Sequence, residues 1–511
     1  MKVAYSKQER PGPALLLIIL AVTAVVIGVP QLLYGSVYSV HQDLAGSALS
    51  GRLANTLGAS FGDYSIYFPP AERAWFSLAA CLSDLTGTRL DLTVVAMTSA
   101  AVLFSTSLAF SIRRRTVGAS PLFLIIPAAL LLFLPMVFKN IFGLREHMVV
   151  LGLWPYLVLR VSDPRDTQVG WKTRLVLGVW LGATLLFKYL YALVVLLVEL
   201  ADAAVQRRFM ALFRIENLVA GGIVALYLFL WLVLHPSQRE AIGMLKSAID
   251  ANLIDARSNL LTFLIRLPLA VYFIAGARVF KWPLRETLFG LALLIGSMVV
   301  AAIQARWYSH HVYPITMAYI AWWWMLGRRI QWWGHLAVAL LIVMPVIPQY
   351  RMLASYQEET DEIAQAMEEE GISVEGKRVG MLAVHPSPYN EYFAAHGAWR
   401  WNASANNSYV ASALQDFDTR ENRGLVAPPV TLTEPGRVYL HDEMLRLWED
   451  MPPDALILDN KKNWPLRHAK IDWLQAFSQD TRFNAIMADY EPVFVHKGER
   501  LEFTYYVRKG D

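Results

Sequence analysis

The sequence predicts a mainly α-helical, polytopic membrane protein of about eleven transmembrane helices, with a C-terminal α/β domain outside the membrane. Two observations carry this prediction. Of the 511 residues, 55% are hydrophobic and only 17% are charged, whereas charged residues make up about 25% of a soluble globular protein. In addition, apolar windows near the ~20 residues that cross a bilayer recur from residue 13 to residue 349 and then stop.

These windows define a membrane-spanning part, which we place at residues 1–350. The first window is too long, and has too many successors, to be a cleaved signal peptide. The fifth and sixth windows are short, so they form either two spans or one kinked helix. The predicted spans are 13–33, 93–111, 119–137, 147–161, 174–187, 190–205, 215–234, 260–277, 285–303, 311–326 and 333–349.

Lysine and arginine set the predicted orientation. With a cytoplasmic N-terminus, the segments that face the cytoplasm carry more Lys and Arg than the outer segments, although the outer segments are longer in total. The positive-inside rule favours this arrangement, and an odd number of spans then places residues 351–511 outside the cytoplasm. The net charge of +4 fits an inner-membrane protein of this kind and indicates no nucleic-acid partner.

Residues 351–511 predict a small α/β domain. The segment 356–371 is acidic, with three apolar residues at helical spacing, Ile363, Ala366 and Met367, and predicts a surface helix. The single cysteine excludes an intramolecular disulfide, so this domain depends on its core. The other predicted elements are buried strands at KRVGMLAV and DALILDN, a helix at WLQAFSQD and a closing hairpin at EPVFVHKGERLEFTYYVRK.

A long outer loop, residues 34–92, follows the first span. Leucines recur in it at helical spacing among small and polar residues, which predicts a helix in the plane of the membrane interface. Two carboxylates flank this helix, Asp43 just before it and Asp63 just after it. The leucines are Leu49, Leu53 and Leu57.

Two further outer segments combine cations with histidine, and the predicted topology places them on the same face as the long loop. Arginine presents a planar fork of donors that suits phosphate, and histidine adds a proton-dependent donor. These side chains are therefore candidates to hold a lipid phosphate, while a carboxylate from the long loop removes a proton from an incoming hydroxyl. The candidates are Arg145, Glu146 and His147 before the fourth span, Lys188 between the fifth and sixth, and Arg306, Tyr308, His310 and His311 before the tenth.

Simpler interpretations remain open for the same residues. Cations and histidines at span ends also anchor in the lipid headgroups, and a neighbouring arginine and glutamate also form an ion pair that shapes a loop. Asp43 suits a helix N-cap, and Asp63 suits the start of a turn. The headgroup interpretation applies to Lys188, Arg306, His310 and His311, and the ion-pair interpretation to Arg145 and Glu146.

This layout resembles the GT-C superfamily of membrane glycosyltransferases. The tripeptide Arg145–Glu146–His147 resembles the R-E-H element of a bacterial subset, where Gly-Gln often precedes it; here Gly143–Leu144 stands in that place. YSHHVYP is similar to a Tyr/His-then-Pro element of that subset, and FGDYSIYFPP resembles its D-Y-x-x-Y-x-P-P stretch. The resemblance implies a polyprenyl-phosphate-linked sugar as donor, transfer on the periplasmic side, an aspartate of the long loop as general base and, in some members, a divalent metal (Mg or Mn).

Two aspartates compete for the role of base. Asp43 follows the first span closely, where the superfamily usually places its acidic residue, but Leu44 replaces the common glutamate after it. Asp63 therefore stays an alternative base, or a group that orients the acceptor or a metal. Glu146 is a candidate to hold Arg145 in position.

The outer domain offers a weak candidate for acceptor binding. The segment HGAWRWNASANNSY carries Trp399 and Trp401 near several amides, and aromatic faces with amide donors suit sugar rings. Alternatively, these tryptophans pack the domain against the membrane.

The predicted function is a membrane glycosyltransferase that moves a sugar from a polyprenyl-phosphate donor to a cell-envelope glycan, glycolipid or similar acceptor. A lipid-linked glycan flippase or transporter, and a non-catalytic scaffold for envelope assembly, are the alternatives. The interior of the spans is nearly free of charge, Glu199 and Arg266 being exceptions, whereas the ionisable residues collect on one face. This asymmetry favours chemistry at a surface over passage through a pore.

Overall fold

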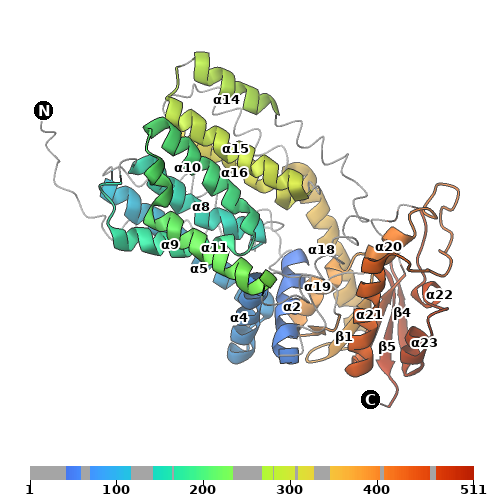
Figure 1. The fold of residues 1–511 in the computed structure, drawn as a ribbon. Helices are drawn as coiled ribbons and strands as arrows, with labels where there is room; N and C mark the ends of the chain where they lie inside the picture. Colours follow the sequence, from blue (N-terminus) through green and yellow to red (C-terminus); the bar gives the residue numbers. More distant parts are fainter. Residues whose placement is uncertain are drawn as a thin grey trace, which may run out of the picture. The chain divides into compact units, whose positions relative to one another are not determined.

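The computed structural model describes residues 42–58, 70–116, 142–163, 166–233, 267–279, 281–304, 309–326, 346–402, 408–460, 466 and 468–510. The chain forms two compact units, each described by itself below (Figure 1). Unit 1 comprises Met1–Val37, Thr98–Tyr227 and Arg257–Tyr350, and unit 2 comprises Tyr38–Met97, Leu228–Ala256 and Arg351–Asp511.

Unit 1 is helical in its described residues. Every predicted span is mainly helical where it falls within these residues; 13–33, 119–137, 260–266 and most of 333–349 lie outside them. The helices are α5 (Leu90–Thr116, which begins in unit 2), α8 (Arg145–Ser162), α9 (Trp171–Leu185), η3 (Tyr189–Tyr191), α10 (Ala192–Gln206), η4 (Phe209–Phe213), α11 (Ile215–Leu228), η5 (Phe229–Val233, in unit 2), α14 (Leu267–Val279), α15 (Leu284–Gln304) and α16 (Ser309–Leu326).

Within the described part of the chain, three helical segments are long and apolar enough to cross a membrane, judged by length and composition. They are Leu90–Thr116, Tyr189–Gln206 and Leu284–Gln304. Two shorter apolar helices, Ile215–Trp231 and Ala270–Val279, fall below that length. The total of about eleven spans stays a prediction.

Glycines let the helices of unit 1 approach one another closely. A Cβ atom at Gly178 of α9 would lie 2.9 Å from the Cα of Glu216 in α11. One turn later, a Cβ at Gly182 would lie 3.1 Å from the Cα of Ala220. Small residues four apart are a common device for close packing of membrane helices. Figure 1 shows α8, α9, α10, α11, α15 and α16 as one bundle.

The bundle has two polar ends. Because an α-helix rises about 1.5 Å per residue, Arg145 and Arg160 of α8 lie about 22 Å apart along its axis. We call the end at Arg145 the head end and the end at Arg160 the network end. The predicted outer residue Lys188 contacts the head end, and the predicted inner residue Arg285 contacts the network end. These contacts agree with the predicted alternation of the loops, whereas which end faces the cytoplasm stays a prediction.

Charged side chains form several ion pairs with one another at the network end. Arg160 and Glu216 are both fully buried and in direct contact, and Arg214 lies 2.7 Å from Glu199 and 2.8 Å from Asp202. The sequence analysis treated Glu199 as an exception within a span; the structure shows it paired with arginine and accepting from Tyr156 at 2.6 Å. We call this group the buried ionic network: Arg160, Asp163, Asp166, Arg174, Glu199, Asp202, Arg214, Glu216 and Arg285.

Unit 2 contains a five-stranded mixed sheet with the strand order β2-β1-β3-β5-β4. β1 is parallel to β2 and β3, and β5 is antiparallel to both β3 and β4. The predicted strands and the closing hairpin are confirmed. The elements are α2 (Gln42–Leu57), α4 (Pro70–Thr86), α18 (Val346–Glu369), β1 (Arg378–Leu382), α19 (Ser387–His396), β2 (Trp399–Arg400), α20 (Ser408–Ala413), α21 (Pro435–Asp450), β3 (Ala455–Asp459), α22 (Trp473–Ala476), α23 (Thr481–Ala488), β4 (Tyr490–Lys497) and β5 (Glu502–Arg508).

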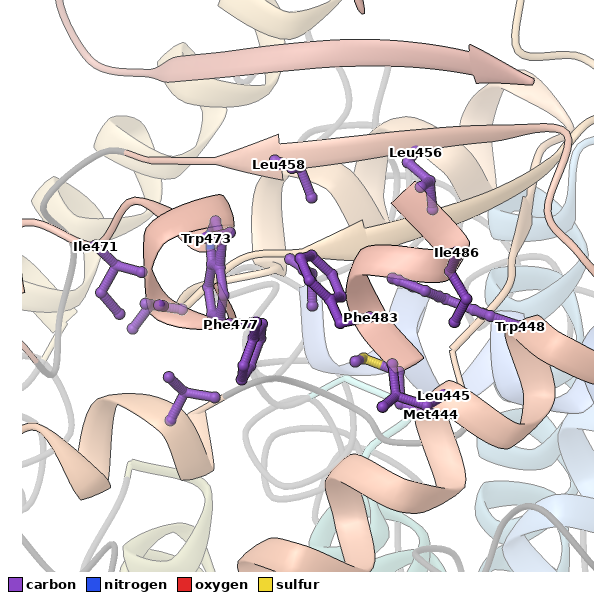
Figure 2. Close-up of a cluster of buried hydrophobic side chains, with 14 of the residues drawn as sticks. Met444, Leu445, Trp448, Leu456, Leu458, Ile471, Trp473, Phe477, Phe483 and Ile486 are labelled. Atoms are coloured by element: carbon purple, nitrogen blue, oxygen red, sulfur yellow. The ribbon is translucent and has the colours of Figure 1, made fainter. Parts of the chain in front are cut away.

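Helices cover both faces of this sheet. Successive strand residues point to opposite faces, and Figure 2 shows Leu456 and Leu458 of β3 directed toward Trp448 of α21 and Phe483 of α23. On the other face, Tyr389 of α19 packs edge-on against Phe503. The predicted acidic helix is part of α18, and its three apolar residues are buried as expected: Ile363, Ala366 and Met367.

The helix predicted to lie in the membrane interface is covered by protein instead, which corrects that prediction. α2 is helical as expected, but its leucines are buried within unit 2, and Leu53 and Leu57 belong to the same core cluster as Trp401. An apolar stripe suits lipid and protein equally, and here protein covers it. The structure accordingly groups residues 38–97 with 351–511, whereas the predicted division places 34–92 in the membrane-spanning part.

Candidate active site

The head end of unit 1 begins with a backbone turn that fixes His147. Gly143 has a φ of 81°, a conformation that favours glycine. Its N–H donates to Nδ1 of His147 at 3.0 Å, and the imidazole is fully buried. A neutral ring that accepts at Nδ1 carries its proton on Nε2, which is therefore a donor. The ring also packs against Phe142, with a centroid distance of 5.2 Å.

Lys188 lies at a break in the helices. α9 ends at Leu185 and α10 begins at Ala192, with the short η3 between them, so the fifth and sixth predicted spans are separate helical segments. The Lys188 ammonium forms an ion pair with the carboxylate of Glu146 in the first turn of α8. The Glu146 side chain is 2% exposed and that of Lys188 is 12% exposed. Glu146 therefore holds Lys188, a partner that the sequence analysis did not foresee.

The start of α16 lies beside the start of α8. Tyr313 of α16 packs edge-on against His147, with a centroid distance of 6.3 Å. α16 begins at Ser309, so the backbone places His310 and His311 in its first turn, at the head end. The predicted ligands Arg306 and Tyr308 lie outside the described residues. The head end thus unites three predicted stretches: Arg145 to His147, Lys188 and the N-terminal end of α16.

The preferred catalytic base belongs to unit 2. Asp43 is the second residue of α2 and is exposed, so it lies in the first helical turn and not at the N-cap. The helix dipole favours an acidic side chain at that position. The competing Asp63 lies outside the described residues. That a carboxylate of the long loop and the cations of the head end share one substrate stays a prediction.

Trp401 corrects the predicted acceptor site. It is 1% exposed, its indole N–H donates to the Met451 carbonyl at 2.7 Å, and it belongs to the core cluster of unit 2. A sugar cannot stack on a ring enclosed in this way, and the ring does not face a membrane either. Trp399 is half-buried against the same cluster, so only this tryptophan remains a candidate for acceptor binding.

Metal ligands are scarce in the part of the chain that the structure describes. Among those residues, no group of three or more His, Cys, Asp and Glu side chains is arranged to hold a metal ion. The predicted divalent metal stays a prediction.

Two residues of the head end escaped the sequence analysis as functional candidates. Gly143 sets the His147 tautomer, and Tyr313 covers the imidazole. The signal for the first was present, since a glycine directly before a cluster of ionisable residues often marks a required turn. Tyr313 lies in the YSHHVYP stretch, but nothing in the sequence indicated that it would pack against His147.

Comparisons with known proteins give a structural likeness. No protein-family model matches the chain, and no curated protein matches it either. The fold is similar to the crystal structure of ArnT from Cupriavidus metallidurans bound to undecaprenyl phosphate. The two chains are 14% identical, the match covers 97% of this chain and 98% of that one, and the TM-score is 0.47.

Proposed function

We propose that the protein is a membrane glycosyltransferase of the GT-C type, which transfers a sugar from a polyprenyl-phosphate donor to a glycan, glycolipid or similar acceptor of the cell envelope. The observation that supports this most is the gathering of Arg145, His147 and Lys188 at one end of an apolar helical bundle. A donor of this class has a phosphate beside a long hydrocarbon tail. A cationic end on an apolar bundle suits both parts.

Formal charge supports phosphate binding at the head end. Arg145 and Lys188 are cations and Glu146 is the one carboxylate of the stretch, so this group keeps a net positive charge. The Nε2–H of His147 adds a neutral donor in a site shielded from water, where electrostatic interactions are stronger. Because Glu146 pairs with Lys188, we assign the first contact with phosphate to Arg145 and His147, and an orienting role to Lys188.

The proposed reaction uses Asp43 as general base. Its carboxylate removes the proton from an acceptor hydroxyl while the hydroxyl oxygen attacks the anomeric carbon of the donor sugar. The bond from that carbon to the phosphate oxygen breaks, and the polyprenyl phosphate leaves with the additional negative charge. Arg145 and His147 stabilise that charge, a task for which preorganised donors are effective. We extend the proposal to a divalent metal beside the phosphate, which chelation followed by readdition of Mg²⁺ or Mn²⁺ would test.

The test separates donor binding from transfer. Arg145→Ala should weaken binding of polyprenyl phosphate to the detergent-purified protein about 10- to 150-fold, since a hydrogen bond to a charged group contributes about 1.5–3 kcal/mol. Asp43→Asn should retain that binding and lose sugar transfer. Lys172→Ala is the matched control, because Lys172 is an exposed cation at the beginning of α9, away from the head end.

Each contrary result points to a different alternative. Full transfer by Asp43→Asn would move the role of base to Asp63 or remove the mechanism. Unchanged lipid binding by Arg145→Ala and His147→Ala would favour the scaffold. Lipid binding without transfer from any donor, combined with transport in vesicles, would favour the flippase.

A further inference from the structure

Among the described residues, one arginine of unit 2 is buried without an acidic partner. Arg400 of β2 is 2% exposed, and its guanidinium donates to two neutral groups: the Asn390 side-chain oxygen at 3.1 Å and the Ser50 hydroxyl at 2.7 Å. Its Nε–H has no hydrogen-bond partner among the described residues. Burial lowers the pKa of Arg400 to about 10. Buried arginines are usually paired with a carboxylate, so this one calls for an explanation.

The two acceptors come from different parts of the chain. Asn390 is on α19 of the C-terminal segment, whereas Ser50 is in the middle of α2, 350 residues before Arg400. The Ser50 hydroxyl in turn donates a hydrogen bond to the Gly46 carbonyl one turn earlier, at 2.9 Å. One guanidinium therefore links β2, α19 and two successive turns of α2.

At Gly46 there is little space between α2 and the side chains of Asn390 and Arg400. A Cβ atom at Gly46 would lie 3.1 Å from Nδ2 of Asn390 and 3.2 Å from Nη1 of Arg400. These separations are tighter than ordinary contacts, so a larger side chain would have to displace the Asn390 amide and the Arg400 guanidinium that contact α2. Further along the helix, Leu53 enters the core cluster of the same unit. Polar and apolar contacts thus seat the same face of α2 on the C-terminal domain.

Asp43 lies on the N-terminal part of α2, close to the contacts that hold this helix against the C-terminal domain. It precedes Gly46 by three residues and Ser50 by seven, which places it about 4 and 10 Å from them along the helix axis. Residues three, four and seven apart share one side of a helix. Because a helix is rigid over two turns, contacts at Gly46 and Ser50 also fix the position of Asp43. A displacement of about 1 Å at a reacting group lowers the reaction rate about 100-fold.

From this geometry we infer that Arg400 is a positioning residue: the C-terminal domain uses it, together with Asn390, to fix the helix that presents Asp43 to the acceptor. Two neutral acceptors in a fixed fork give a directional contact that a point charge would not give. This inference rests on the proposed function for the role of Asp43. That these contacts hold α2 against the C-terminal domain, which we call the seating of α2, is a separate structural claim.

The experiment measures seating and catalysis separately in the full-length protein. In a Cys81→Ser background, Leu53→Cys introduces a single thiol that reacts with an alkylating reagent only when α2 leaves the domain. Arg400→Ala should raise the alkylation rate at least tenfold and lower kcat at least tenfold, with little change in the KM for donor. Gly46→Val should do the same by steric means. Arg482→Ala, which removes an exposed ion pair of the same domain, should do neither.

Conservative replacement gives a graded result. Arg400→Lys keeps the charge but presents one compact donor group, so it should restore part of the seating and part of kcat. Unchanged alkylation in Arg400→Ala and Gly46→Val would overturn the inference, and so would faster alkylation with unchanged kcat. If Asp43→Asn keeps full activity while Arg400→Ala still exposes the thiol, the proposed base is wrong and the seating of α2 stands.

Discussion

Replacing Arg160 by methionine tests the buried ionic network of unit 1. Arg160 is fully buried, touches Glu216, and lies 3.3 Å from Asp166 and 3.4 Å from Glu199. The network contains four arginines and five carboxylates, so its formal charge is −1. Arg160→Met makes that charge −2, with the excess on carboxylates enclosed by helices.

The expected cost is large. Removing one partner of a buried ion pair destabilises a protein by about 3–5 kcal/mol. Glu216 keeps Arg174 at 3.0 Å, but the network then carries one more uncompensated negative charge away from water. At roughly 2–4 °C per kcal/mol, the scale for domains of 150–250 residues, the melting temperature should fall by about 6–20 °C. Adding Glu216→Gln restores the original net charge and should recover at least half of this loss.

Thermal unfolding of the detergent-purified protein, followed by tryptophan fluorescence, is a suitable assay. Arg482→Met serves as control, since Arg482 pairs with Glu449 at the surface of unit 2 and exposed pairs contribute about 0–1 kcal/mol. A small effect of Arg160→Met, or equal effects in the presence and absence of Glu216→Gln, would refute the pairing described for the network.

Two further predictions concern the head end and the C-terminal domain. Gly143→Ala should weaken polyprenyl phosphate binding several-fold in a titration, because a φ of 81° disfavours alanine and the N–H that orients His147 would move. Burial lowers the pKa of His441 below its usual value, although the nearby Asp480 acts in the opposite direction. A lowered folded-state pKa means that stability is lost as the pH falls below ~6.5, the usual histidine value. His441→Phe keeps the ring contact with Phe477 and should flatten the decline in melting temperature between pH 7.5 and pH 5.

Local patterns predicted the elements of this protein well. Apolar windows gave the helices of unit 1, and the alternation in EPVFVHKGERLEFTYYVRK gave β4 and β5, because each pattern depends only on neighbouring residues. The partner of an element is a long-range property. The leucine stripe of α2 predicted a helix correctly, but it contained no information on whether lipid or the core around Trp401 would cover it.

The candidate site was predictable to the same extent. The sequence indicated the stretch Arg145–Glu146–His147, because three ionisable residues between apolar runs are unusual. The structure places Lys188 beside Glu146. The role of Glu146 was not predictable, since its partner is 42 residues away. Arg400 was overlooked between Trp399 and Trp401, whose aromatic rings suggested a sugar site.

The two ends of unit 1 differ in a way that bears on where a phosphate binds. At the network end carboxylates outnumber arginines, and Arg160, Arg174 and Arg214 each lie within 3.4 Å of more than one of them. These arginines are each paired with carboxylates, and the buried ionic network has a formal charge of −1, so its arginines are poorly suited to bind a phosphate. The head end has the opposite balance, with Arg145 and Lys188 against Glu146.

The same difference affects the predicted orientation. The segments predicted to face the cytoplasm include Arg160, Arg174, Arg214 and Arg285, yet these four arginines are paired with carboxylates inside the fold. They cannot also attract anionic headgroups, although they still contribute while the chain is being inserted. The predicted orientation of the finished protein therefore depends on the predicted inner cations outside the network, such as the Arg113–Arg115 run at the end of α5. That run lies on the predicted inner side, opposite the head end, so the proposed phosphate site at the head end is predicted to face the periplasm.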